Sequence, residues 1–79
     1  MKKFEMTGSP KTAGFSTKSI FAEKMSDFGW EQCKMTKRNN TCDILVTDDI
    51  SKSSNKMELA KELGVEIMSY EEIVELFEL

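Results

Sequence analysis

Short apolar runs alternate along this chain with longer segments of helical periodicity, and this alternation restricts the fold more than any other feature. Apolar and polar residues alternate over Lys3–Thr7 and over residues 31–35, a short apolar run occurs at Ile44–Val46, and the segment Val65–Met68 follows Gly64. Both patterns are typical of β-strands. Strands that alternate with helices favour a parallel sheet, because a helix supplies the crossover that parallel neighbours need.

Three segments have the periodicity and the end signals of helices. The first is expected to begin at a Ser16 cap and to run to about Phe28. The second should begin near Ser53 or Ser54 and end at Gly64, which can adopt the left-handed conformation that often ends a helix. Two helices thus separate the predicted strands.

The third helix has the clearest beginning. Ser69 and Glu72 are spaced as a capping box, and Met68 and Ile73 can form a hydrophobic staple around it. This helix is expected to run to the C-terminus. The chain is therefore predicted to be an α/β protein with a small four-stranded, mostly parallel sheet flanked by three helices, in the order β-α-β-β-α-β-α.

A chain of 79 residues forms one domain, so residues 1–79 are expected to share a single core. The apolar positions of the predicted strands and helices define that core. Its predicted members are Phe4, Ile20, Phe21, Met25, Phe28, Ile44, Val46, Met57, Ala60, Leu63, Val65, Ile67, Ile73, Val74 and Phe77. Trp30 is expected either at a partly buried strand edge or as an exposed contact for a partner.

The cysteines and the lack of histidine limit the possible chemistry. Cys33 and Cys42 are nine positions apart without a CxxC spacing, and the chain has no histidine. Neither a zinc site nor a Cys-His nucleophile can be built from these parts, so no metal, cofactor or catalytic residue is expected. Both cysteines are predicted to be reduced thiols.

Composition and charge favour an intracellular protein with a polarised surface. Apolar residues make up 39% of the chain and charged residues 32%, which is ordinary for a folded domain. No apolar run approaches the length of a membrane span, and no secretory signal begins the chain. The protein is therefore expected in the cytoplasm and nucleoid or in the nucleus.

Charge is distributed unevenly along the chain. Residues 1–42 carry eight Lys and Arg against four acidic residues, whereas residues 57–79 carry one Lys against seven Glu. The basic half is available to a phosphate-bearing partner.

The order of four motifs resembles that of a BRCT domain. Phe4–Gly8 is similar to the family's first strand, and Met25–Trp30 to the end of its first helix. Lys37–Thr47 is similar to the family's loop and following strand, and Ser54–Ser69 to its S-x-K-x-x-x-A-x-x-L-G-I stretch. The resemblance covers nearly the whole chain. The single BRCT domains of NAD-dependent DNA ligases and of the replication factor C large subunit are the most similar subgroup, because they also lack a Trp in the last helix.

The resemblance implies a phosphate site at the end of the first strand. In that fold the Thr7 hydroxyl, the Gly8 backbone N–H and the Lys56 ammonium converge on one spot. Each can donate a charge-assisted hydrogen bond to a phosphate. In the subgroup an arginine near the start of helix one assists, but Phe15 occupies the nearest position here. Further contacts to a DNA backbone would come from Lys11, Lys18, Lys37, Arg38 and Lys52.

Two classes of function follow from these patterns. The first is a non-catalytic module of DNA replication or repair, which binds DNA ends or nicks through a 5′-phosphate. The alternative is a protein-interaction adaptor that docks a partner through Trp30 or the acidic last helix, or that binds a phosphopeptide. Neither requires a membrane.

Overall fold

The computed structural model describes residues 2–77 and contains a four-stranded sheet. Its strands are β1 (Lys2–Met6), β2 (Trp30–Gln32), β3 (Ile44–Thr47) and β4 (Glu66–Ser69). They lie in the order β2-β1-β3-β4, and every pairing is parallel. The predicted α/β class, number of strands and sequence of elements are thus confirmed, and the sheet is wholly parallel within the described residues.

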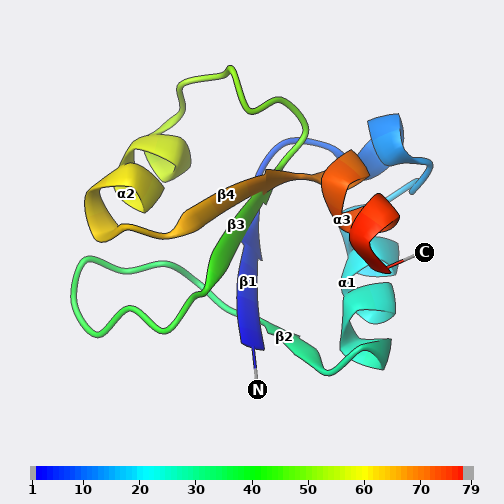
Figure 1. The fold of residues 1–79 in the computed structure, drawn as a ribbon, viewed down its shortest axis with the longest axis horizontal. Helices are drawn as coiled ribbons and strands as arrows, with labels where there is room; N and C mark the ends of the chain where they lie inside the picture. The colour runs from blue at the N-terminus through cyan, green and yellow to red at the C-terminus, as the bar shows by residue number, and fades with distance from the viewer. Residues whose placement is uncertain (1, 78–79) are drawn as a thin grey trace.

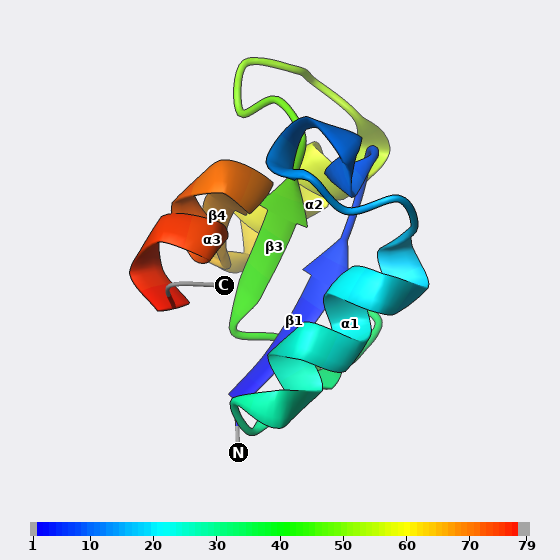
Figure 2. The same ribbon diagram turned by 90° about the vertical axis from the view of Figure 1, so that its right-hand side faces the viewer.

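The helices cover both faces of this sheet (Figures 1 and 2). Helices α1 (Lys18–Asp27) and α3 (Tyr70–Phe77) lie on one face, and α2 (Asn55–Leu63) lies on the other. A short 3-10 helix, η1 (Pro10–Ala13), follows β1 and contacts α3. The end of the predicted third helix, residues 78–79, lies outside the described residues.

Helix caps explain where the helices begin. Thr17, not the predicted Ser16, caps α1, because its side-chain oxygen accepts a hydrogen bond from the Ile20 N–H at 3.2 Å. Ser54 caps α2 as one of the two predicted alternatives, and Gly64 ends it with a φ of 74°. At α3, Ser69 and its partner three residues on form the predicted reciprocal capping box.

The core divides into two clusters, one on each face of the sheet. Beneath α1 and α3, Phe21 is buried among aromatic rings, with centroids 6.3 Å from Phe4 and 4.8 Å from Tyr70. Beneath α2, Leu45 and Met57 pack with smaller side chains. Alternate residues of the central strands therefore supply both faces, as expected for a parallel sheet covered on both sides.

Two predicted core residues are in fact exposed. Ile20 is 40% exposed and Phe28 is 50% exposed. The prediction was wrong for Ile20 because the side of α1 that carries Phe21 and Met25 faces the sheet, and Ile20 lies about 100° from Phe21 around the helix. Phe28 follows the last residue of α1 and stacks on Phe77 at the surface. The buried apolar residues that the prediction missed are Met6, Met35, Cys42, Leu45 and Tyr70.

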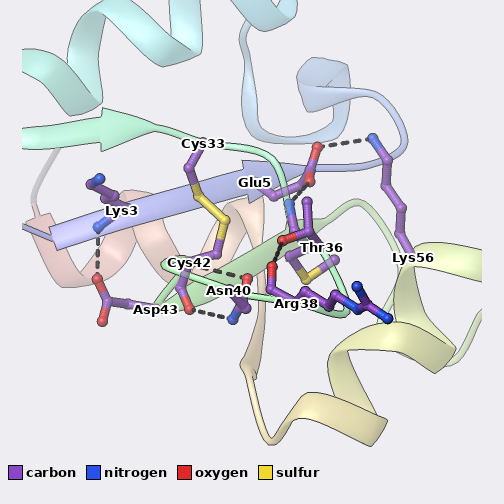
Figure 3. Close-up of a disulfide and its surroundings, with 10 residues drawn as sticks. Lys3, Glu5, Cys33, Thr36, Arg38, Asn40, Cys42, Asp43 and Lys56 are labelled. Atoms are coloured by element: carbon purple, nitrogen blue, oxygen red, sulfur yellow. Dashed lines mark hydrogen bonds and ion pairs between the residues drawn. A yellow bond between two sulfur atoms is a disulfide. The ribbon is translucent and has the colours of Figure 1, made fainter.

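The cysteines form a disulfide rather than the predicted pair of reduced thiols (Figure 3). Their Cα atoms lie 6.1 Å apart. Backbone hydrogen bonds to β1 explain this proximity: the Cys33 N–H donates to the Phe4 carbonyl, and the Asp43 N–H donates to the Lys3 carbonyl, both at 2.8 Å. Because both chain segments pair with neighbouring residues of β1, the cysteines meet across it. The spacing of the two cysteines along the sequence does not by itself indicate this pairing.

Within residues 2–77, none of the helices combines the length and the apolar character that crossing a membrane requires.

Candidate functional site

The predicted site lies where the carboxyl ends of β1 and β3 meet. The Thr7 N–H donates to the Val46 carbonyl at 2.8 Å and keeps the two strand ends in register. The chain then turns at Gly8, whose φ is 74°, while Asp48 follows the end of β3. In parallel sheets such ends share one edge, so residues about forty positions apart become neighbours.

Lys56 reaches this edge from the first turn of α2. Its ammonium Nζ donates to the Met6 carbonyl at 3.1 Å. The same Nζ lies 3.2 Å from Glu5 Oε1 (Figure 3). The contacted carbonyl immediately precedes Thr7 in the chain. The structure therefore brings the predicted lysine to the predicted strand end, although the two are about fifty residues apart in sequence.

Glu5 already neutralises much of the lysine charge. The Glu5 side chain is only 11% exposed, and its second oxygen, Oε2, accepts a hydrogen bond from the Met35 N–H at 2.6 Å. A carboxylate removed from water needs such partners, because an unpaired buried charge is strongly unfavourable. Lys56 is thus held in place by a fixed anion rather than left free in solvent.

On the opposite face, Tyr70 supports the same strand end. Its hydroxyl donates to the Thr7 carbonyl at 3.1 Å. Burial raises the pKa of the Tyr70 hydroxyl, and the negative charge of Asp48 raises it further. The hydroxyl therefore stays protonated and remains a donor to the Thr7 carbonyl.

Asp48 occupies the space beside the turn. One of its oxygens, Oδ2, accepts a hydrogen bond from the Ser9 N–H at 3.1 Å, and the Lys52 ammonium lies 3.5 Å from both oxygens. The Ser9 hydrogen bond is the main cause that lowers the pKa of Asp48, and Lys52 lowers it further. A Cβ placed on Gly8 would overlap the Asp48 carboxyl group, so glycine permits this close approach.

The other cationic candidates do not share one face. Lys11 lies in η1 and Lys18 begins α1, whereas Lys37 and Arg38 lie in the connection from β2 to β3. This connection packs on the α2 face through residues such as Met35. Figure 3 places Arg38 in that connection, on a different segment from Lys56. Among the candidates for backbone contact, Lys52 joins the edge around Gly8.

Phe15 occupies the position that the resemblance assigns to an arginine. Its ring packs edge to face on Phe21, with centroids 5.2 Å apart. The residue therefore extends the aromatic core rather than supplying a cation.

Three residues of the site were not predicted. Glu5 lies between Phe4 and Met6, so strand alternation predicts that its side chain lies on the other face of the sheet from theirs. Because both faces of a parallel sheet are buried, a carboxylate there needs a hydrogen-bonding or charged partner. Asp48 follows an apolar strand, so the shared edge of parallel strands was a usable signal. Tyr70 carried no signal for its hydrogen bond, because that contact depends on the tertiary packing of α3.

No family model, curated protein or solved structure matches this chain.

Proposed function

We propose that the chain is a non-catalytic phosphate-recognising module of DNA replication or repair, which binds DNA ends or nicks through a 5′-phosphate. The proposal rests on the resemblance to BRCT domains and on one geometric observation. That observation is the approach of the Lys56 ammonium to the Met6 carbonyl, 3.1 Å away and directly before the Thr7-Gly8 turn.

The chemistry of this edge suits an anion. The Thr7 hydroxyl, the Gly8 N–H and the Lys56 ammonium are donors of different kinds, and a phosphate oxygen accepts from all three. The Ser9 N–H and Lys52 already hold one carboxylate at the neighbouring position. Because these groups would contact phosphate oxygens rather than base edges, the proposed binding has little sequence preference.

Binding of paired duplexes tests this function. Two otherwise identical duplexes, one with and one without a 5′-phosphate, are titrated at two salt concentrations. The phosphorylated duplex is expected to bind about tenfold more tightly, with an affinity that falls steeply as salt rises. Equal binding of the two duplexes contradicts the proposal.

Lys56→Ala and Lys61→Ala form a matched pair for the same assay. Both lysines lie on α2 and both substitutions remove one positive charge, but Lys61 only faces exposed Glu58 at 3.9 Å. Lys56→Ala should remove the preference for the 5′-phosphate, whereas Lys61→Ala should change it less than about twofold. Urea unfolding of both variants separates lost binding from lost folding.

A protein-interaction adaptor is the second candidate, and a surface hollow favours it. This hollow of about 560 Å³ lies between α1 and β2, and its walls include Glu23, Trp30 and Glu31. Half-buried Trp30 offers an aromatic contact there, consistent with the role of such residues in interfaces. If neither duplex binds but a phosphoserine peptide binds better than its unmodified form, the same phosphate site serves a protein partner.

A further inference from the structure

Asp48 and Glu5 are both carboxylates that pair with a lysine of the candidate site. Glu5 is part of β1, and both of its oxygens have partners in the protein, Lys56 and the Met35 N–H. Asp48 lies in the connection from β3 to α2, and its cationic partner Lys52 is 59% exposed. The Asp48 side chain is 16% exposed and the Glu5 side chain 11%, so the two differ in their partners: Glu5 is fixed within the sheet, whereas the cation beside Asp48 is mobile and exposed.

The position of Asp48 is that of an anion at the turn. Its carboxylate accepts from the Ser9 N–H, lies beside Lys52, and fills the space that the missing side chain of Gly8 leaves open. A phosphate approaching the Gly8 backbone from this side would meet the same carboxylate. Two negative groups cannot share the position without strong repulsion.

We propose that Asp48 is an internal competitor for the phosphate site, and that it must leave the Gly8-Ser9 turn before an external phosphate can bind there. This inference rests on the proposed function. Asp48 therefore sets the affinity of the site, and a ligand binds only when its phosphate makes better contacts than the carboxylate it displaces.

Rotation of the Asp48 side chain away from the Gly8-Ser9 turn breaks few contacts. Asp48 gives up the Ser9 hydrogen bond and can keep its ion pair, because the Lys52 side chain is flexible and exposed. The released Ser9 N–H then becomes a donor for the phosphate. Thr7 and Lys56 need not move, since Tyr70 and Glu5 hold them from the two faces.

Asp48→Ala and Asp49→Ala test the inference as a matched pair. Each substitution removes one negative charge from the same connection, but Asp49 hydrogen-bonds Ser51 and not the Gly8-Ser9 turn. Inorganic phosphate is titrated into each labelled protein while the Ser9 amide resonance is followed by NMR. The 5′-phosphorylated duplex is titrated in parallel.

Asp48→Ala is expected to bind phosphate at Ser9 about tenfold more tightly than wild type, whereas Asp49→Ala should change the affinity less than about twofold. Asp48→Asn serves as a second variant, because its amide oxygen can still accept from Ser9 and preserve the turn. The dispersion of the amide spectrum reports folding in each sample.

The outcomes separate this inference from the proposed function. If Asp48→Ala takes up inorganic phosphate at Ser9 but shows no preference for the 5′-phosphorylated duplex, the inference holds and the DNA function fails. If wild type prefers the phosphorylated duplex and both Asp48 variants bind it like Asp49→Ala, the function holds and the inference is overturned. If neither Asp48 variant shifts the Ser9 resonance with phosphate, the inference is also overturned.

Discussion

The two faces of the sheet differ in the side chains and bonds that stabilise them. The face under α1 and α3 contains aromatic rings that pack edge to face, among them Phe4, Phe21 and Tyr70. The face under α2 has smaller side chains, a disulfide and the buried carboxylate of Glu5. One face is stabilised mainly by apolar burial, and the other adds a covalent link and a polar network.

This difference follows from the number of helices on each face. Two helices cover the aromatic face, whereas α2 alone, together with the connection from β2 to β3, covers the other. That connection has no helix or strand of its own, so backbone order there depends on its anchors. The disulfide (Figure 3) and the hydrogen bond from the Met35 N–H to Glu5 supply two of them.

The largest expected effect comes from breaking the aromatic face. Phe21→Ala removes a fully buried ring that contacts Phe4, Phe15 and Tyr70. We expect the free energy of unfolding to fall by about 4 kcal/mol, enough to unfold much of so small a domain. Urea unfolding measures this loss.

Phe28→Ala is the control for that substitution. The Phe28 ring is half exposed, so its loss should cost less than about 1.5 kcal/mol. Similar losses for both variants would contradict the assignment of Phe21 to the centre of the aromatic face.

Reduction of the disulfide is expected to weaken the opposite face by a smaller amount. The bond closes a loop with a sequence separation of nine, for which loop entropy predicts about 2.5 kcal/mol. Urea unfolding with and without reductant measures the difference. If the faces are independent, reduction should cost the same in Phe28→Ala as in wild type. A disulfide that contributes nothing to stability would refute its role as an anchor.

The polar contact on each face gives the next comparison. Glu5→Ala removes the partner of Lys56 and leaves the Met35 N–H without its acceptor, at a cost of about 2 kcal/mol. Tyr70→Phe removes one neutral hydrogen bond to Thr7 and should cost about 1 kcal/mol. Thermal unfolding of the two variants ranks them, and the reverse order would show that the aromatic face depends more on its polar contact.

The sequence predicted the regular framework better than the connections. Strand alternation and the caps at Ser54 and Ser69 are local, so element order, sheet class and two helix starts were predictable. The disulfide was not, because Cys33 and Cys42 meet only after both of their segments pair with β1. Burial of Phe28 was wrongly predicted because periodicity does not tell where a helix stops covering the sheet.

For the candidate site, the sequence could indicate donors but not how far they are already paired. Thr7, Gly8 and Lys56 were singled out through a resemblance, and the structure brings the Lys56 ammonium to the Met6 carbonyl, directly before Thr7. Their acidic neighbours, Glu5 and Asp48, carried local signals, but the donors with which they pair are set by the packing of α2 and of the turn after β1. Charge balance in the site is thus a tertiary property.

Acid titration gives the smallest effect and concerns the edge that both faces share. The pKa of Asp48 is lowered from its usual value of 3.8, chiefly by the Ser9 N–H and then by Lys52. A carboxyl group whose pKa is lower in the folded protein contributes stability when the pH is above its unfolded pKa, and that contribution is lost as the pH falls through its folded pKa.

Wild type is therefore expected to be more stable than Asp48→Asn at neutral pH, by under about 1 kcal/mol, and to lose this difference as the pH falls below about 4. The cost of Phe28→Ala, in contrast, should stay constant over the same range, because the Phe77 ring on which Phe28 stacks does not titrate. Urea midpoints from pH 7 to pH 2.5 measure both gaps. A gap between wild type and Asp48→Asn that does not change with pH would mean that the Ser9 hydrogen bond does not depend on the carboxylate charge.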